Sequence, residues 1–152
     1  MYITHPNHEA RKLSRTGHTS WTLTEIEFTD GPYLETNSTT TTLTPSGTTG
    51  SITITASASL WATTDVGRLV SFSNGRAKIT GFTSATIVDA TTQDDFDNTA
   101  AVTTWKLGAF SDTTGHPSCV SFFEQRLVFA GTTAEPQTLY FSKSGDYENM
   151  TT

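Results

Sequence analysis

The sequence predicts an all-β fold in which a partial, β-propeller-like scaffold is interrupted by a small inserted β domain. About a fifth of the residues are Thr, whose β-branched side chain favours strands over helices. No stretch of ten or more residues shows a convincing helical period. A Thr-rich middle, residues 34–104, separates two flanks, residues 1–33 and 105–152, and the second flank has the short, closely spaced strands that suit a sandwich or a propeller blade.

Chain length, net charge and cysteine content limit the classes of protein to which this sequence can belong. The 152 residues are enough for one ordinary domain or two small ones. The net charge of −6 is poor for direct binding of nucleic acid, which needs Lys and Arg to displace counterions. The single cysteine, Cys119, excludes an internal disulfide framework, and its context before two Phe residues predicts a small buried apolar group. No run of 18 apolar residues exists, so we expect no membrane anchor.

In the first flank, residues 20–28 alternate as a strand, and a slip in alternation between Leu23 and Ile26 predicts a bulge. Asp30-Gly31-Pro32 ends this strand with turn residues. Residues 34–50 indicate a loop or a weak edge strand. Single helical turns are expected at residues 63–66 and 94–97, each with an Asp or Thr suited to capping.

The inserted domain is predicted as a β-meander or small sandwich of about four strands. Residues 51–56 alternate at period two, and residues 67–72 and 76–82 flank the hairpin signal Asn74-Gly75. Residues 85–90 supply a further strand, and an acidic loop follows.

The second flank predicts strands around Trp105–Leu107 and at residues 120–123, 126–130 and 138–141. We expect Trp21, Trp105, Phe122 and Phe129 in the core. Trp61 either packs on the insert's sheet or is an exposed contact residue, and the sequence leaves both open.

Arg126 lies between apolar strand residues and is expected to pair with a carboxylate. Asp146 and Glu124 are the candidates, and this pair would fix the edge of the blade. The structural candidates are therefore Arg126, Asp146, Trp105, Trp21 and Trp61.

No group of residues predicts a catalytic, cofactor or metal site. His5, His8 and His18 lack accompanying Cys ligands for zinc, and the acidic run at residues 94–98 departs from the EF-hand pattern. Asp112 and His116 lack a Gly-x-Ser-x-Gly nucleophile elbow. The only basic cluster, Arg11-Lys12-x-x-Arg15, is interpreted as a solvated or inter-subunit segment rather than a nucleic-acid site.

Several stretches of the flanks together form a pattern that points to a family. They are Thr4-His5-Pro6 through Arg15-Thr16-Gly17-His18, Trp21, residues 28–33, Gly115-x-Pro117, Phe122-Phe123-Glu124-Gln125-Arg126-Leu127, Pro136-Gln137-Thr138-Leu139 and residues 142–147. The flanks resemble the tail nozzle proteins of short-tailed bacteriophages, also called tail tubular protein B. Asp65-Val66-Gly67-Arg68-Leu69 resembles a motif in the inserted domain of related prophage proteins.

The resemblance implies a structural virion protein, assembled in the host cytoplasm, with no enzymatic activity and no cofactor. In that family a β-propeller carries inserted domains, and copies of the protein form a ring, expected to be a hexamer, around the channel through which DNA leaves. The implied partners are copies of the chain, the tail adaptor, tail fibre proteins and DNA that passes without specific binding. The family's proteins are several times longer than this chain, which is therefore expected to be a fragment, a cleaved piece or a short relative.

Two other functions remain as alternatives. The Thr-rich meander could serve as a carbohydrate- or receptor-binding module of a phage tail, with Trp61 exposed beside a shallow polar groove. A cell-wall hydrolase would need two converging carboxylates, but the acidic residues are scattered over turns.

Overall fold

A computed structural model describes residues 1–151, and these residues form twelve β-strands and one short 3₁₀ turn. The predicted all-β class is confirmed. The chain divides into two compact units, which are described separately below. The first unit comprises residues 1–32 and 114–152, and the second comprises residues 33–113. Within residues 1–151 there is no helix with the length and apolar character needed to span a bilayer.

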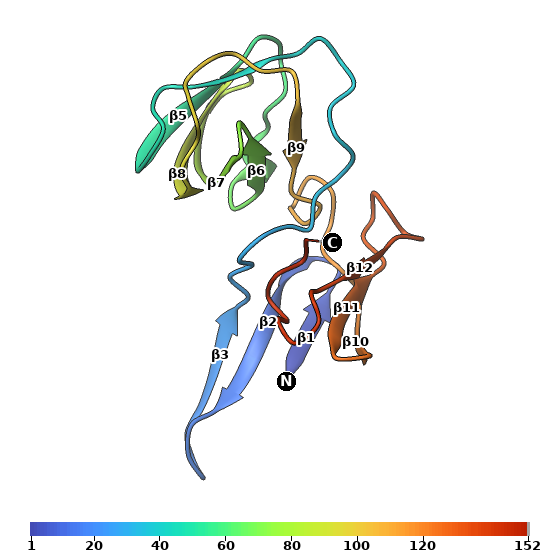
Figure 1. The fold of residues 1–152 in the computed structure, drawn as a ribbon. Coiled ribbons are helices and arrows are strands. Elements are labelled where there is room, and N and C mark those ends of the chain that lie inside the picture. Colours follow the sequence, from blue (N-terminus) through green and yellow to red (C-terminus); the bar gives the residue numbers. More distant parts are fainter. Residues whose placement is uncertain (152) are drawn as a thin grey trace. The chain divides into compact units, whose positions relative to one another are not determined.

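The first sheet of the first unit contains β1 (Tyr2–His5), β2 (His8–Arg15) and β3 (Trp21–Glu25) in the antiparallel order β1-β2-β3. Figure 1 shows β2 and β3 as a long hairpin. The expected bulge between Leu23 and Ile26 is absent, because β3 pairs regularly with β2 and ends at Glu25. Ile26 then turns inward, is buried, and donates its N–H to the Ala10 carbonyl oxygen at 3.0 Å.

The second sheet of the first unit contains β10 (Cys119–Phe123), β11 (Arg126–Ala130) and β12 (Leu139–Phe141), again antiparallel and in chain order. The predicted strands at residues 120–123, 126–130 and 138–141 therefore form. Leu127 and Phe129 of β11 are fully buried, and the Phe28 ring meets Phe129 edge-on at 5.8 Å between centroids. These contacts form the inner side of the sheet.

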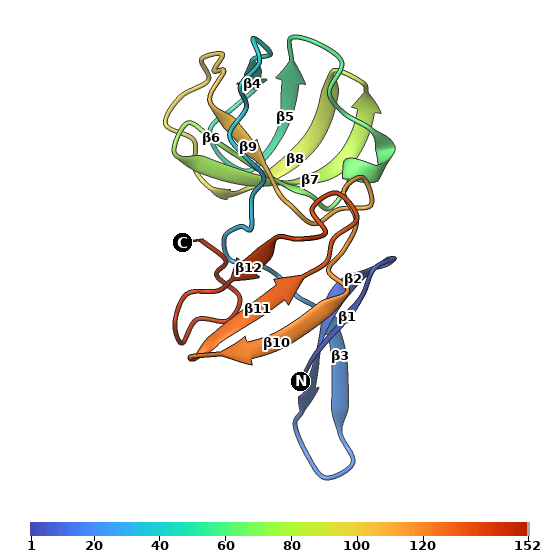
Figure 2. The ribbon, with the colours of Figure 1, turned by 90° about the vertical axis from the view of Figure 1, so that its right-hand side faces the viewer.

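The second unit is a single six-stranded sheet that curls on itself (Figure 2). Its strands lie in the order β4-β5-β8-β7-β6-β9. Their bounds are β4 (Leu43–Pro45), β5 (Ser51–Ala56), β6 (Leu69–Phe72), β7 (Gly75–Ser84), β8 (Ile87–Asp94) and β9 (Trp105–Leu107), with the 3₁₀ turn η1 at Thr63–Asp65. The concave side encloses a core of aliphatic and aromatic side chains that includes Ile54, Val70, Ile79 and Val88.

The unit boundaries differ from the expected ones at the second junction. Residues 105–113 were expected in the scaffold, but β9 pairs with β6 through Val70 and Leu107. Trp105 consequently lies in the core of the second unit, where its Nε1 donates to the Thr41 carbonyl oxygen at 2.9 Å. The change in composition after residue 104 was visible in the sequence, but the pairing of β9 with β6 was not.

Two local predictions are refined by the backbone. The β6–β7 hairpin forms, but its two turn residues are Ser73 and Asn74, with φ of 46° and 59°, and Gly75 opens β7. The helical turn predicted at residues 63–66 forms as η1. The one predicted at residues 94–97 is wrong, because Asp94 ends β8 and the Phe96 ring stacks on Phe72 at 4.3 Å.

The predictions of burial were mixed. Trp105 and Phe129 are in the core as expected, and Trp61 is buried with 4% of its surface exposed. Trp21 and Phe122 were expected in the core, but each is 56% exposed. Cys119 was also expected to be buried and is exposed. All three exposed residues belong to strands of the first unit, Trp21 to β3 and the other two to β10. Phe122 lies opposite the buried Leu127 and contacts the rings of Tyr2 and Tyr147, but these contacts leave more than half of it exposed.

Candidate assembly surface

One face of the β1–β3 sheet carries apolar side chains that the rest of the chain leaves exposed. Cross-strand partners in an antiparallel sheet share a face, so the register assigns its members. Leu13 opposes Leu23, Arg15 opposes Trp21, and both Ile3 and Glu25 oppose Arg11. We call this the hairpin face: Ile3, Arg11, Leu13, Arg15, Trp21, Leu23 and Glu25.

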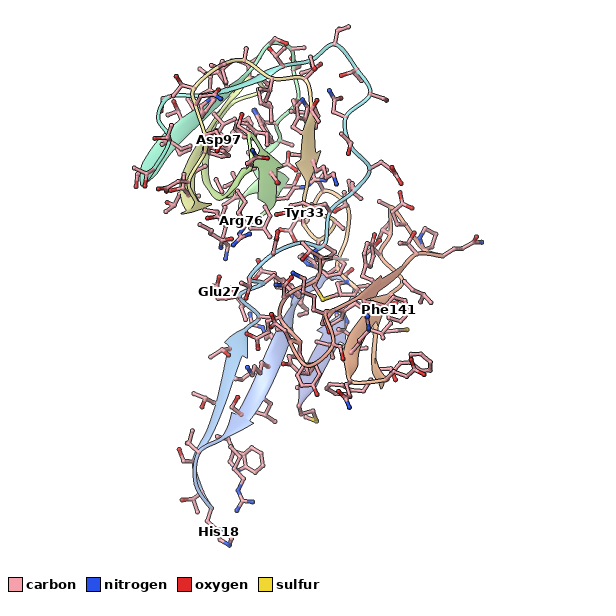
Figure 3. The ribbon with its side chains drawn as sticks, in the orientation of Figure 1. His18, Glu27, Tyr33, Arg76, Asp97 and Phe141 are labelled. Atoms are coloured by element: carbon pink, nitrogen blue, oxygen red, sulfur yellow. The ribbon has the colours of Figure 1, made fainter. Side chains whose placement is uncertain are left out.

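Much of the exposed surface of the hairpin face is apolar. Trp21 and Leu23 are each at least half exposed, and Ile3 is exposed as well. The Arg15 guanidinium lies 5.7 Å from the centre of the Trp21 ring, which is a cation–π distance. His18 lies at the tip of this hairpin (Figure 3) and its Nδ1 is 2.6 Å from Arg15 Nη2. The hairpin therefore presents an apolar strip with a basic end.

The opposite face of the same sheet is partly covered near β1. Tyr2 and Lys12 are cross-strand partners on that face, and both contact the Glu148 carboxylate, by a hydrogen bond from the Tyr2 hydroxyl and an ion pair with Lys12 Nζ. The Tyr2 ring also lies 5.9 Å from that of Phe122. The segment around Glu148 thus covers the part of this face near β1, while Thr22 and Thr24 of β3 stay exposed, and it does not contact the hairpin face through these groups.

The contacts around Glu148 shift two pKa values in the same direction. The hydrogen bond to Glu148 is the main cause that raises the pKa of Lys12. Burial, followed by the charge of Glu148, raises the pKa of the Tyr2 hydroxyl. Both groups therefore hold their proton more firmly in the folded chain than in the unfolded chain.

The β10–β12 sheet repeats this arrangement. Its inner face holds the buried residues Leu127, Phe129 and Tyr140. The other face, which we call the outer face, consists of Cys119, Ser121, Phe123, Arg126, Val128, Ala130, Leu139 and Phe141. Phe123 and Leu139 are each more than half exposed, and Val128 and Phe141 are only partly covered. The β10–β12 sheet therefore bears apolar side chains on both faces, whereas the β1–β3 sheet bears them mainly on the hairpin face.

The expected ion pair of Arg126 is not formed among residues 1–151. Arg126 instead donates Nη1 to the Ser142 carbonyl oxygen at 3.3 Å. The backbone N–H of Asp146 closes a turn on the Lys143 carbonyl oxygen at 3.2 Å. The link that joins β11 to the following turn is the Ser142 hydroxyl, which accepts the Leu127 N–H at 2.8 Å and donates to the Lys143 carbonyl oxygen at 2.9 Å.

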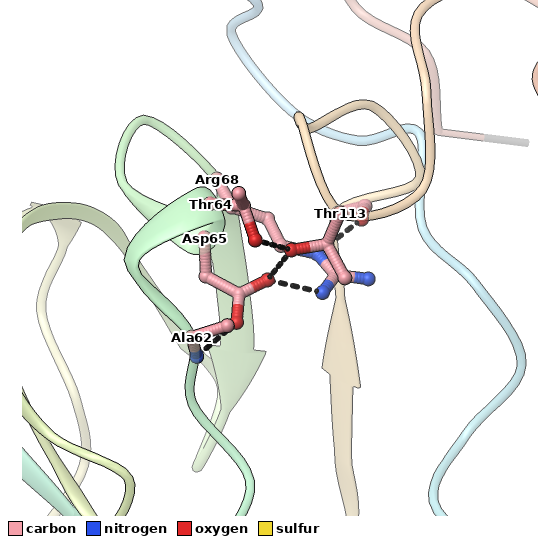
Figure 4. Close-up of polar contacts among 6 residues, drawn as sticks. Ala62, Thr64, Asp65, Arg68 and Thr113 are labelled. Atoms are coloured by element: carbon pink, nitrogen blue, oxygen red, sulfur yellow. Dashed lines mark hydrogen bonds and ion pairs between the residues drawn. The ribbon is translucent and has the colours of Figure 1, made fainter.

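The second unit contains a buried charged cluster around the Asp65-Val66-Gly67-Arg68 turn (Figure 4). Arg68 Nη1 donates to Asp65 Oδ1 at 2.8 Å, and both side chains are at least 95% buried. Asp65 Oδ2 accepts the Ala62 N–H at 2.9 Å, and the Thr113 hydroxyl donates to Oδ1 at 2.8 Å. Arg68 Nε donates to the Gly108 carbonyl oxygen at 2.8 Å.

This cluster ties η1 to β9 and to the end of the second unit. Burial lowers the pKa of Arg68, while the hydrogen bond and charge of Asp65 oppose that shift. Because each carboxylate oxygen of Asp65 accepts a hydrogen bond from inside the unit, the pair has the character of a structural clamp. Charges of opposite sign three residues apart across a Gly-containing turn were the signal for it in the sequence.

The side chains considered for metal binding do not form a ligand cluster among residues 1–151. Asp112 belongs to the second unit and His116 to the first. The rings of His5 and His8 lie 5.1 Å apart, and His18 lies at the hairpin tip. Among the residues that the structure describes, no three His, Cys, Asp or Glu side chains are grouped closely enough to hold a metal ion.

Comparisons with known proteins do not identify a family for this chain. No protein-family model and no curated protein sequence matches the chain. The two exposed sheet faces of the first unit are the features of the chain that bear most directly on its function.

Proposed function

We propose that this chain is a structural component of a phage tail nozzle, which assembles with copies of itself into a ring around the DNA exit channel and docks other tail proteins. The observation that carries the proposal is the pair of open apolar sheet faces in the first unit. Leu23 and Trp21 mark one face, and Phe123 and Leu139 mark the other. Exposed contiguous apolar faces on folded domains are typical of protein–protein interfaces.

A sheet that is apolar on both sides, as the β10–β12 sheet is, is typical of architectures in which sheets stack face to face. Stacking of further sheets on the hairpin face and the outer face is what a propeller or a ring of subunits would provide. A single patch meeting a different patch on the next copy gives a head-to-tail interface, which closes into a ring when the rotation permits.

Charge supports the role of a conduit. The net charge of −6 repels phosphate, so a duplex passing through the ring would slide rather than bind. The proposal includes no enzymatic step, and it places the protein in the virion.

The test is self-association of the purified chain. Light scattering coupled to gel filtration is expected to show a concentration-dependent oligomer, and negative-stain electron microscopy is expected to show rings with a central channel. Leu23→Lys on the hairpin face and Leu139→Lys on the outer face should each shift the equilibrium toward monomer, because a charge cannot be buried there without a partner.

Thr55→Lys is the matched control, since Thr55 is exposed on β5 of the other unit and takes the same new charge. It should leave the oligomer unchanged. A chain that stays monomeric at millimolar concentration, or that forms only irregular aggregates indifferent to all three substitutions, overturns the proposal.

A further inference from the structure

The outer edge of the β1–β3 sheet is formed by β3, which has no strand beside it on that edge among residues 1–151. All five residues of β3 are exposed. Figure 1 shows β2 and β3 extending past β1, and the pairing of residues 1–5 with β2 reaches only to Leu13. The far part of the hairpin is thus a two-stranded ribbon, which by itself is only marginally stable in water. A further strand along β3 would stabilise it.

The β3 strand lacks the features that protect sheet edges in natural proteins. Exposed edges usually carry Lys or Pro, contain a bulge, or consist of a very short strand. β3 contains neither Lys nor Pro, and it pairs with β2 without a shift in register. Its only charge is Glu25, at its end. By contrast, β4, β9 and β12 are edge strands of only three residues each. The edge of β3 is therefore suited to accept another strand.

The hydrogen bonds at the two ends of the β2–β3 pair show which residues face β2. At one end the Ile26 N–H donates to the Ala10 carbonyl oxygen at 3.0 Å. At the other end the Thr16 N–H donates to the Ser20 carbonyl oxygen at 3.0 Å. Residues that face the partner strand alternate with residues that face away from it in an antiparallel pair. The backbone groups of residues 20, 22, 24 and 26 are therefore directed toward β2.

The same alternation directs the backbone groups of Trp21, Leu23 and Glu25 toward the open edge. Their side chains belong to the hairpin face, which is exposed as well. The edge thus presents three N–H groups and three carbonyl oxygens in the spacing of a β-ladder, with no strand of residues 1–151 to pair with them.

The residue order of β3 is complementary to itself in the antiparallel direction. When two copies of β3 pair about Leu23, this residue opposes the partner's Leu23, and Trp21 opposes the partner's Glu25. Every outward residue then has an outward partner, and each such pair exchanges two hydrogen bonds. Registers centred elsewhere leave at least one of the three beyond the end of the partner strand. A register centred on Glu25 also places like charges opposite each other, which is destabilising.

The charges on the hairpin face fit this register. Arg15 opposes Trp21 within one copy, and Arg11 opposes Glu25 within the other, so the four side chains form one row across the two sheets. The partner's Glu25 then lies between its own Arg11, at 3.3 Å, and the Arg15 guanidinium that lies over the Trp21 ring. No like charges oppose each other across the edge, and the central carboxylate gains a second cation nearby.

We infer that two copies of this chain pair through the edges of β3, antiparallel and centred on Leu23, so that their three-stranded sheets join into one. Leu13 and Leu23 of both copies form an apolar row across the joined sheet. The contact is isologous, because each copy offers the same edge. It is also small, so the association is expected to depend on concentration. It uses backbone groups that face stacking leaves free, so the inference does not rest on the ring.

Amide hydrogen exchange of the whole chain, resolved to single residues and compared at micromolar and millimolar protein, tests the pairing. The amides of Trp21, Leu23 and Glu25 are expected to exchange freely in the dilute sample and about tenfold or more slowly in the concentrated one, because only a second strand gives them a hydrogen bond. The amides of Thr22 and Thr24, bonded to β2, are the internal control and should exchange alike in both. Free exchange of the three outward amides in the concentrated sample overturns the inference.

Leu23→Pro removes the central outward N–H and keeps every N–H that is donated to β2, since an edge strand tolerates Pro where its nitrogen faces away from the sheet. It should weaken dimerisation about tenfold or more, because both hydrogen bonds of the central pair are lost. Leu23→Val is the matched control, since it keeps the N–H and an apolar side chain, and it should dimerise within about threefold of the unmodified chain. Equal dissociation constants for the two variants in analytical ultracentrifugation overturn edge pairing.

Disulfide trapping identifies the strand that occupies the edge and requires no change of the backbone. With Cys119→Ser to remove the exposed native thiol, Leu23→Cys should crosslink two copies under mild oxidation, because directly opposed residues lie within disulfide distance. Leu13→Cys is the control, since its counterpart in the second copy is three strand spacings, about 14 Å, away. Protection of the outward amides without a crosslink at position 23 would mean that a different strand occupies the edge, which overturns the twofold arrangement.

Edge pairing and ring assembly can fail separately. Leu139→Lys tests the ring from the other sheet of the first unit, so it should leave edge pairing unchanged. A dimer on which Leu139→Lys has no effect supports the edge contact and contradicts the ring. A larger oligomer whose β3 amides exchange freely does the reverse.

Discussion

At the scale of single residues, substitutions in the Asp65–Arg68 pair have the largest predicted effect on the free energy of unfolding. Removal of one member of a buried ion pair leaves an uncompensated charge in the interior, and the cost is much greater than the net worth of the pair itself. Here each Asp65 oxygen and two Arg68 nitrogens are engaged within the second unit. The pair is therefore a sensitive point for folding rather than for chemistry.

Arg68→Leu should reduce the free energy of unfolding of the second unit by about 3–5 kcal/mol, because Asp65 would remain buried and charged without its main partner. Urea unfolding in a Trp21→Phe background reads this unit, since both remaining Trp residues lie in its core. Asp65→Asn combined with Arg68→Leu should cost less than the sum of the two single changes.

Lys106→Leu is the control for that experiment, because it removes an exposed positive charge from β9 of the same unit. It should change stability by less than about 0.5 kcal/mol. Equal urea midpoints for Arg68→Leu and Lys106→Leu would contradict the clamp.

The cluster around Glu148 gives a pH-dependent prediction. The folded pKa is raised for both Tyr2 and Lys12, above ordinary values of 10.0 and 10.5. The unfolded chain therefore loses these protons first, so the stability of the first unit is complete below pH 10 and declines as pH rises through the raised values. Hydrogen exchange of β1 and β2, compared at about pH 8 and at about pH 11 after correction for intrinsic rates, measures the decline.

Tyr2→Phe keeps the ring against Phe122 and removes the titrating hydroxyl. The stability of the first unit should fall less steeply with rising pH in this variant than in the unmodified chain. A decline of the same steepness in both proteins would assign the effect to other groups.

At the scale of elements, the two-residue turn between β10 and β11 is the clearest case in which the residue types do not suit the backbone conformation. Glu124 and Gln125 have φ of 45° and 61°, in the left-handed region that Gly and Asn prefer. Phe123 pairs with Arg126 directly across them, so no longer loop relieves the conformation. The strained residues lie in an exposed hairpin.

Glu124→Asn together with Gln125→Gly should raise the stability of the first unit by about 1 kcal/mol, because Asn-Gly is the preferred pair for this kind of turn. Thermal unfolding followed by circular dichroism measures the change. Gln125→Val should act in the opposite direction, since a β-branched residue is strained at positive φ. If both variants shift the midpoint in the same direction, the turn is not the cause.

The strands themselves were largely predictable from alternation and turn residues, as β5, β7 and β11 show. Which face of each sheet is open could not be predicted. Alternation predicts that Trp21 and Leu23 lie on the same side of β3, but only the structure shows that Glu148 contacts the opposite side of the sheet.

At the scale of the whole molecule, each unit is expected to unfold as its own cooperative block. The core cluster of the second unit, from Leu43 to Leu107, draws on residues of that unit alone. Because this core is complete within the unit, a fragment of residues 33–113 is expected to fold.

The fragment is expected to keep a β-type circular dichroism spectrum and to show a single sigmoidal urea transition with a native-like midpoint. The same fragment carrying Val70→Asp, which places a charge in the middle of the core, is the unfolded control. A flat, featureless unfolding curve for the unmodified fragment would mean that the unit borrows its stability from the rest of the chain.

The chain enters and leaves the second unit at neighbouring points. Tyr33, its first residue, forms an antiparallel bridge with Gly108, and the Leu34 N–H donates to the Leu107 carbonyl oxygen at 2.8 Å. A segment whose two ends are adjacent can be deleted, exchanged or acquired during evolution without a change in the distance that the flanking chain must span. Related proteins should therefore differ most by the presence and kind of module at this junction, and recombinant grafting of a foreign domain here should be tolerated.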